Sequence, residues 1–413
     1  MVPEIESPRR LPLFALFAAQ GISMVGNVLT GIAVPWFVLE TTGSATLTGL
    51  AAFASALPVV LAAFFGGAIV DRLGFRRTSV AADLASMATV ALVPLLHVTV
   101  GLPFWALLVL VFLGALLDAP GSTARTALLP DVARAAGWRM ERAASAIQVI
   151  ERGSRLVGAP LAGVLIAVLG AAPVLWIDAT TFAVSAALVA LAVPAARRVS
   201  AEPAARPSYF DDLLSGLRFI RAEPVVLAIV LTVLVTNLMD APTFAVILPV
   251  YAMQTYGSAL PLGLMIAANG GGAVLGALAY GAMGHRLSRR WTFAIGFVVA
   301  GLLFWVLALL PPLEIAVGAM LLAGIAAGPL NPVIDTVIFA RVPQALRGRV
   351  LGSLTAGAFL GIPVGMLLGG GLVESLGLRP TLLIIAACYL LTTLSLLVNP
   401  ALRDMDARAS DSA

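Results

Sequence analysis

The sequence predicts an all-α polytopic membrane protein with twelve transmembrane helices arranged as two six-helix bundles. The chain has 413 residues, of which 60% are hydrophobic and 11% are charged, whereas a soluble domain is typically about 25% charged. Its apolar runs are long enough to cross a bilayer, which takes about 20 residues each. In addition, short segments recur in the same order in the two halves of the chain.

Each expected span is an apolar run bounded by arginine, proline or glycine. The first run, which begins at Leu11, is too long for the core of a cleavable signal peptide and is therefore read as a membrane helix. The expected spans cover 11–38, 46–70, 78–98, 103–125, 143–168, 172–193, 224–250, 258–283, 291–310, 314–340, 349–373 and 379–398.

The arginines orient these spans. All 25 basic residues are arginine, and 22 of them, Arg125 included, fall on the cytoplasmic side if the N-terminus is cytoplasmic. Arg152 and Arg155 lie within a span, and Arg379 falls outside. This asymmetry follows the positive-inside rule and predicts a multi-pass protein of a bacterial cell (inner) membrane with both termini in the cytoplasm. Because the arginines are dispersed along the chain, no nucleic-acid partner is expected.

The longest connection predicts the domain boundaries. Residues 194–223 hold several prolines and charges, followed by an amphipathic stretch from Tyr209 to Ile220 that is typical of a helix on the membrane surface. We therefore expect an N-terminal six-helix bundle at 1–193, a cytoplasmic linker with an amphipathic surface helix at 194–223, and a C-terminal six-helix bundle with a short cytoplasmic tail at 224–413.

The recurring segments indicate transport. Many secondary transporters consist of internal repeats, with the substrate site between them. The sequence therefore predicts that the protein moves a solute across the membrane. One pair is separated by 214 residues and another by 203; the matches join Gly67-Ala68 to Gly281-Ala282, Asp71-Arg72-Leu73 to His285-Arg286-Leu287, Gly158-Ala159-Pro160 to Gly361-Ile362-Pro363, and Pro120 and Pro130 to Pro332 and Pro343.

The loop between the second and third spans has the most specific motif. Glycine permits close helix approach and a tight turn there, and the arginines face the anionic cytoplasmic surface. The motif resembles the signature loop of the major facilitator superfamily, except that Phe75 stands where the family usually has arginine. The resemblance implies that the loop gates the cytoplasmic side. The gating residues are Gly67, Asp71, Arg72, Gly74, Arg76 and Arg77.

Further segments narrow the resemblance. Leu129-Pro130-Asp131, Ala136-Gly137-Trp138, Leu346–Val350 and Pro400–Arg403 are similar to the Tap-type multidrug efflux transporters of actinobacteria. The resemblance implies a monomeric secondary transporter that exports amphiphilic small molecules by drug:H⁺ antiport and alternating access, and hence a role in antibiotic resistance. The antiporter motif of the fifth span is altered, because Pro160 is shifted by one position. A dedicated exporter or importer of one metabolite, siderophore or lipid-like compound is the alternative, and a lipid-handling or sensing protein is a third possibility.

Ionisable groups within the spans are candidates for proton coupling, because burying them in a membrane is costly without a role. We expect Asp118 to pair with Arg152 across neighbouring helices, and Glu151 to pair with Arg155 four residues later. Asp83 and Asp178, near the ends of their spans, are interpreted as structural. The candidates are Asp118, Glu151, Arg152, Arg155, Asp240 and Asp335.

Polar, methionine and aromatic residues on the first helix of each half, with Phe359 of the span at 349–373, are candidates for a substrate cavity. The resemblance to the major facilitator superfamily implies that these first helices line the cavity. Methionine suits such a site because its side chain adapts to varied ligand shapes. Asp240 carries a charge that would attract a cationic substrate. The candidates are Gln20, Met24, Asn27, Asn237, Asp240, Phe244 and Phe359.

Other classes of function have no support in the sequence. The chain has no lysine, so it lacks the P-loop of ATP-driven transporters. One cysteine and two histidines give no expected metal site or cofactor. No catalytic cluster is recognisable, and we expect the protein not to be an enzyme. Its expected partners are the substrate, protons and the lipid bilayer.

Overall fold

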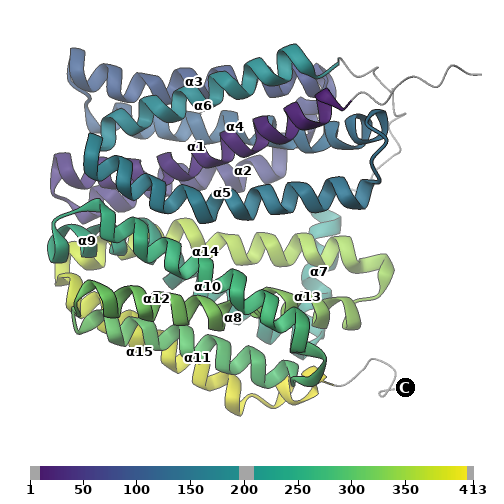
Figure 1. Cartoon of the computed structure of the whole chain (residues 1–413). Coiled ribbons are helices and arrows are strands. Elements are labelled where there is room, and N and C mark those ends of the chain that lie inside the picture. The colour runs from purple at the N-terminus through teal and green to yellow at the C-terminus, as the bar shows by residue number, and fades with distance from the viewer. Residues whose placement is uncertain (1–9, 195–208, 407–413) are drawn as a thin grey trace, which may run out of the picture. The chain divides into compact units, whose positions relative to one another are not determined.

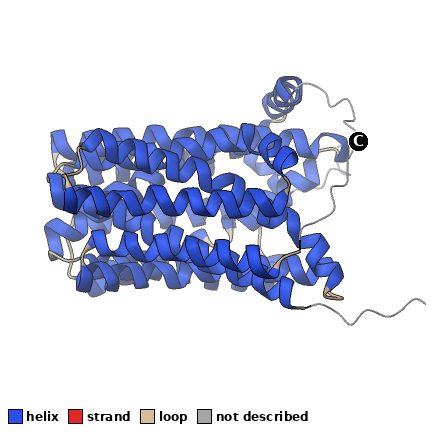
Figure 2. Cartoon of the chain, turned by 90° about the horizontal axis from the view of Figure 1, so that it is seen from above, coloured by secondary structure: helices blue, strands red, loops and turns tan. Residues whose placement is uncertain are grey.

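The computed structural model describes residues 10–194 and 209–406, and all regular elements in these ranges are helices (Figures 1 and 2). Eleven helical segments among the described residues are long and apolar enough to span a membrane. The remaining expected span is α2, Ala45–Leu73, whose side chains from 62 to 73 lie outside the described residues. The predicted class, an all-α polytopic membrane protein, is confirmed.

The N-terminal half consists of long helices separated by short turns. Glycines with positive φ stand at several of these turns, including Gly74 at φ 85° and Gly170 at φ 86°, where a side chain would strain the backbone. α4 continues well beyond the span predicted at 103–125, which places Arg125 inside the helix. The helices are α1 (Leu11–Thr42), α2 (Ala45–Leu73), α3 (Phe75–Thr99), α4 (Phe104–Ala135), α5 (Met140–Leu169) and α6 (Ala171–Ala192).

The C-terminal half is more interrupted. Its first span is broken by a π-helix, η1, which begins directly after Pro242, a residue that has no N–H for the helical ladder. The elements are α7 (Tyr209–Ala222), α8 (Pro224–Pro242), η1 (Thr243–Ile247), α9 (Leu248–Tyr256), α10 (Ala259–Met283), η2 (Gly284–Arg286), α11 (Arg289–Ala308), α12 (Leu313–Ala327), α13 (Leu330–Arg341), η3 (Gln344–Leu346), α14 (Arg347–Leu376), α15 (Leu378–Val398) and η4 (Pro400–Asp406).

α7 is the amphipathic helix predicted from the sequence, and it packs against α14. The contact is close because Gly216 has no side chain: a methyl group there would overlap Ser353 and the backbone of Arg349. The location of α7 on the membrane surface stays a prediction. The preceding linker residues 195–208 lie outside the described residues.

The chain divides into two compact units, residues 1–40 with 53–200, and residues 41–52 with 201–413. The first turns of α2 therefore group with the second unit. There, the carboxylate of Glu374 accepts hydrogen bonds from the Ser44 hydroxyl and from the backbone N–H groups of Ala45, at 2.7 Å, and Thr46, at 3.2 Å. These bonds satisfy the free donors that every helix start exposes. The domain boundaries predicted at 193 and 224 stay a prediction.

The two units repeat one packing scheme. α3 lies against α4 and α6 in the first unit, and α11 lies against α12 and α15 in the second (Figure 1). At the start of α3, Arg76 donates to the carbonyl of Ala190 at the end of α6. At the start of α11, Arg290 donates to the carbonyl of Leu397 at the end of α15, at 2.9 Å. These arginines are separated by the same 214 residues as the sequence repeat.

Small residues join α10 to α12. Gly272 and Gly276 face α12, and Gly324 and Gly328 face α10, each so close that an added methyl group would overlap backbone atoms of the other helix. Helix association in membranes depends on such close contacts, because apolar burial provides little driving force there.

Candidate functional site

Arg125 of α4 is the centre of a buried polar cluster in the first unit. Its side chain is 2% exposed, among the largest fully buried side chains of the described residues. Nη1 donates to Asp83 Oδ1 on α3 at 2.6 Å, and Nε donates to Gln20 Oε1 on α1 at 2.7 Å. Asp83 also accepts from Ser185 on α6 at 2.7 Å. The guanidinium therefore links α1, α3 and α4, and Asp83 extends the network to α6.

Asp118 lies at the edge of this cluster. Its Oδ1 is 3.9 Å from Nη2 of Arg125, and its Oδ2 accepts a hydrogen bond from Asn27 on α1 at 2.9 Å. Its Oδ1 is buried and has no hydrogen-bond partner among the described residues. Asp118 is also 20% exposed as a side chain, so it can exchange protons with water more readily than the fully buried Asp83.

The charges of this cluster do not balance when all three groups are ionised. Asp83 and Asp118 contribute two negative charges, and Arg125 contributes one positive charge. An uncompensated charge inside a membrane protein is costly, so a proton on one carboxylate stabilises the cluster. Both oxygens of Asp83 accept hydrogen bonds, whereas Oδ1 of Asp118 accepts none from the described residues.

Arg125 is buried and does not lie on the cytoplasmic surface, and the predicted pairing of Asp118 with Arg152 is wrong. Asp118 interacts with Arg125 of its own helix, whereas Arg152 is exposed on α5. Asp118 and Arg125 are seven residues apart, which places them two turns apart on one face of a helix. That spacing is visible in the sequence, but it becomes informative only once α4 is known to continue past Arg125.

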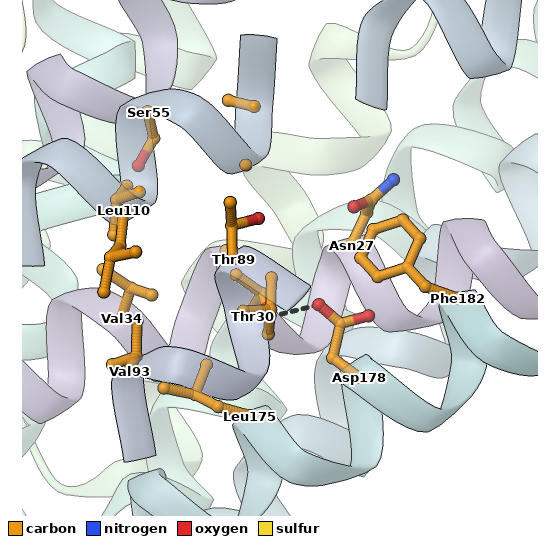
Figure 3. Close-up of a pocket in the computed structure, with 15 residues that line it drawn as sticks. Asn27, Thr30, Val34, Ser55, Thr89, Val93, Leu110, Leu175, Asp178 and Phe182 are labelled. Carbon is orange, nitrogen blue, oxygen red and sulfur yellow. Dashed lines mark hydrogen bonds between the residues drawn. The ribbon is translucent and has the colours of Figure 1, made fainter. Parts of the chain in front are cut away.

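A cavity of about 150 Å³ opens beside this cluster within the first unit (Figure 3). Asn27, which binds Asp118, lines it, and so does Asp178 of α6. Asp178 is fully buried and accepts hydrogen bonds from the hydroxyls of Thr30 and Thr181. The other lining residues come from α1, α2, α3, α4 and α6 and are mostly apolar.

The predicted substrate-cavity residues differ in exposure: Gln20 is buried, and the others described here are half-buried or exposed. Gln20 is 2% exposed and holds Arg125, so its side-chain oxygen is occupied. Asn27 is exposed and lines the cavity, and Met24 of the same helix is half-buried. In the second unit, Phe244 in the π-helix is 36% exposed and Phe359 of α14 is 46% exposed.

In the second unit, Asp240 is half-buried and lies two residues before α8 ends at Pro242. The hydroxyl of Tyr389 on α15 is its hydrogen-bonding partner. Asn237 precedes Asp240 by about one helical turn and is half-buried as well. A π-helix next to a membrane carboxylate is notable because such distortions often occur at functional sites.

The remaining proton-coupling candidates are more exposed. Arg152 and Arg155 are exposed on α5, and Glu151 of the same helix is half-buried. Asp335 is exposed on α13. The structure therefore brings Asp118 into a buried charge cluster and leaves these four side chains outside it.

The gating loop is described in part. The surroundings of Gly67 and the side chains of Asp71 and Arg72 lie outside what the structure describes. Gly74 separates α2 from α3 with φ 85°, and Arg77 is exposed. Arg76 donates to the last carbonyls of α6, which ties the start of α3 to the end of that helix.

Solved structures show the class to which this fold belongs. The chain matches the nucleoside transporter NupG with a TM-score of 0.73 at 12% identity, covering 94% of this chain and 98% of that one. It matches the D-xylose–proton symporter with a TM-score of 0.71 at 13% identity, over 93% and 96% of the two chains. The fold is that of the major facilitator transporters, a class of multi-pass membrane proteins.

Sequence comparison identifies the family. The major facilitator family model described as "Transmembrane secretion effector" matches residues 6–413, and the chain belongs to this family. It is 34% identical over 405 residues to the multidrug efflux pump Tap of Mycolicibacterium fortuitum, covering 96% of this chain and 98% of that protein. It is 28% identical over 365 residues to the enterobactin exporter EntS of Citrobacter koseri, covering 87% and 84%.

Proposed function

We propose that this protein exports amphiphilic small molecules in exchange for protons, by alternating access, and that Asp118 carries the proton. The similarity to the Tap multidrug efflux pumps, over nearly the whole of both chains, supports the export of drugs. The observation that carries the proton assignment is the buried Oδ1 of Asp118, which has no hydrogen-bond partner among the described residues and lies 3.9 Å from Arg125.

The cluster provides a physical route from protonation to helix movement. When Asp118 is protonated, the guanidinium of Arg125 has Asp83 as its ionised partner, at 2.6 Å. When Asp118 is ionised, it competes with Asp83 for the same guanidinium. Because Arg125 links α1, α3 and α4, this competition changes how those helices are held together. A proton entering from outside and leaving inside can therefore drive the opposite movement of the substrate.

The test uses purified protein in lipid vesicles with an acidic lumen and ethidium as a fluorescent substrate. Wild-type protein should concentrate ethidium in the lumen, and a protonophore should release it. Asp118→Asn keeps the shape of the side chain but cannot ionise, so gradient-driven accumulation should fall to the level that the wild type reaches with the protonophore. Counterflow, which exchanges labelled for unlabelled ethidium without a gradient, should persist.

Asp131→Asn is the matched control, because Asp131 is on the same helix but is 53% exposed. It should accumulate ethidium as the wild type does. Accumulation that is insensitive to the protonophore would exclude proton coupling. Normal gradient-driven transport by Asp118→Asn would reassign the proton to another group, with Asp240 and Glu151 the next candidates and Arg152, Arg155 and Asp335 the least supported.

The cytoplasmic gate is part of the same proposal. We assign gating to Gly67, Asp71, Arg72, Gly74, Arg76 and Arg77. The bond from Arg76 to the end of α6 supports this role, because it joins the loop to a helix that also contributes Ser185 to the charge cluster. The candidates for substrate contact are retained for each unit separately: Gln20, Met24 and Asn27 in the first, and Asn237, Asp240, Phe244 and Phe359 in the second.

We further propose that the protein acts as a monomer in the bacterial cell membrane, with both termini in the cytoplasm. The arginine distribution supports this orientation, with Arg125 now removed from the cytoplasmic set. In a Cys388→Ser background, an impermeant maleimide should label Val100→Cys in intact cells and should label Met140→Cys only after permeabilisation. The reverse pattern would invert the topology.

A dedicated exporter of one compound is the second candidate, because a relative at 28% identity bears the name enterobactin exporter. A panel of unrelated cationic, zwitterionic and anionic compounds distinguishes the two. Transport of several unrelated compounds supports a multidrug exporter, and transport of a single compound supports the alternative.

A further inference from the structure

Asp178 is a buried carboxylate that the charge cluster around Arg125 does not use. It is on α6, is fully buried, and accepts hydrogen bonds from the hydroxyls of Thr30 and Thr181, the latter at 3.0 Å. Among the residues that the structure describes, no arginine or histidine lies within salt-bridge distance of it. Two neutral donors only partly replace the hydration that an ionised carboxylate loses in a membrane.

The neighbouring helix is shaped to hold this carboxylate. Gly26 of α1 faces Asp178, and a methyl group at position 26 would overlap both Asp178 Oδ1 and the hydroxyl of Thr181. Thr30, one turn further along α1, donates to the other oxygen. The carboxylate is therefore fixed between α1 and α6 rather than left to move between alternative positions.

Asp178 also lines the cavity of about 150 Å³ (Figure 3). In that view Asn27, Thr30 and Phe182 surround it, whereas Val34, Val93 and Leu110 line the part further away. A cavity of this size holds a group about as large as benzene. It is too small for a whole drug, but it fits one branched or cyclic end of an amphiphilic molecule.

We propose that this cavity binds the ammonium end of cationic substrates, with Asp178 as its counter-ion. The inference rests on the proposed export function and specifies its substrate class. An ammonium group supplies the positive charge that the surroundings of Asp178 lack, and Phe182 offers an aromatic ring to the same cation. The apolar remainder of the cavity covers the alkyl groups on the nitrogen, and the rest of the substrate extends beyond the cavity.

The test uses two fluorescent probes of the same shape. Both are dansyl amides on an alkyl chain; one ends in a trimethylammonium group and the other in an uncharged tert-butyl group. Binding to the purified protein is measured by fluorescence anisotropy, and transport is measured in vesicles. Asp178→Asn should raise the Kd of the cationic probe by about tenfold or more, the effect of losing about 1.4 kcal/mol, and should leave the Kd of the neutral probe within about threefold.

A second variant keeps the Asp178 carboxylate and reduces the volume of the cavity. Gly31 lines the cavity, and an added Cβ there would meet no atom within 4 Å. Gly31→Val should therefore fold, fill part of the cavity and weaken both probes. It also tests the location of the site if Asp178→Asn does not yield folded protein. Asp131→Asn is the matched control, because Asp131 is 53% exposed on α4 and lies outside the cavity, and it should bind both probes as the wild type does.

The possible outcomes distinguish a failure of the export function from a failure of the role proposed for Asp178. If wild-type protein transports neither probe nor ethidium, the export function itself is wrong. If the wild type transports them but Asp178→Asn binds the cationic probe with unchanged affinity, the export function stands and the role of Asp178 is overturned. If Gly31→Val leaves both affinities unchanged, the headgroup binds elsewhere and the inference is likewise overturned.

Discussion

At the scale of single residues, Asp83 is the group that keeps Arg125 buried. It provides the shortest contact to the guanidinium, 2.6 Å, and both side chains are almost fully inaccessible. Removing one partner of a buried ion pair leaves a charge without compensation, whereas replacing both partners by apolar residues is often tolerated. The single variant is therefore expected to be much less stable than the double variant.

Asp83→Leu should destabilise the protein by about 3–5 kcal/mol, because Arg125 keeps its charge and loses its main partner. Asp83→Leu combined with Arg125→Met should recover most of that stability but should not recover proton-coupled transport. Thermal unfolding followed by tryptophan fluorescence measures the first effect, and ethidium accumulation measures the second. A double variant that transports normally would show that the cluster is only structural.

The sequence identified some of these residues but could not identify their partners. Asp118 was predicted to be functional because a charge in a long apolar run is unusual. Its partner depends on how α1, α3 and α4 pack, which no spacing along the chain reports. Asp178 was interpreted as structural from its place near the end of a span. Only the fold shows that it lines a cavity beside Asn27.

At the scale of helices, the close approach of α10 and α12 depends on glycine. Gly276 lies so near Ile325 that a methyl group would overlap its carbonyl, whereas Gly270, on the same helix, has open space around its Cβ position. Two glycines in one helix thus have different roles, and the same substitution distinguishes them.

Gly276→Ala should lower the unfolding temperature because α10 and α12 must separate to admit the methyl group. Gly270→Ala should leave stability unchanged or raise it by about 0.5–1 kcal/mol, since alanine loses less conformational entropy than glycine in a helix. Thermal unfolding of both variants in the same detergent provides the comparison. Equal effects would show that the glycine contact does not stabilise this helix pair.

The spans were predictable because an apolar run of sufficient length has one stable form in a membrane, a helix with all its backbone groups paired. Their ends were less predictable. α4 extends past Arg125 because Asp83 and Gln20 satisfy that arginine inside the bundle. The π-helix that follows α8 could not be predicted either, although Pro242 is visible in the sequence.

At the scale of the whole molecule, the repeat seen in the sequence corresponds to a repeat of helix packing. The polar groups inside the two units nevertheless differ. Arg76 and Arg290 make equivalent bonds in the two units. The interior of the first unit contains Arg125 and its carboxylates, whereas in the second unit the carboxylate of Asp240 has Tyr389 as its partner, and Tyr389 packs against Phe297. This asymmetry supports proton coupling within the first unit.

The most direct test of proton-coupled export reverses the flow. Vesicles containing wild-type protein are loaded with ethidium and a pH-sensitive dye, with no initial pH difference, and are diluted into ethidium-free buffer. Outward movement of ethidium should bring protons in and acidify the lumen, and Asp118→Asn vesicles should show no acidification. Release of ethidium by the wild-type protein without any change in lumenal pH would contradict the account.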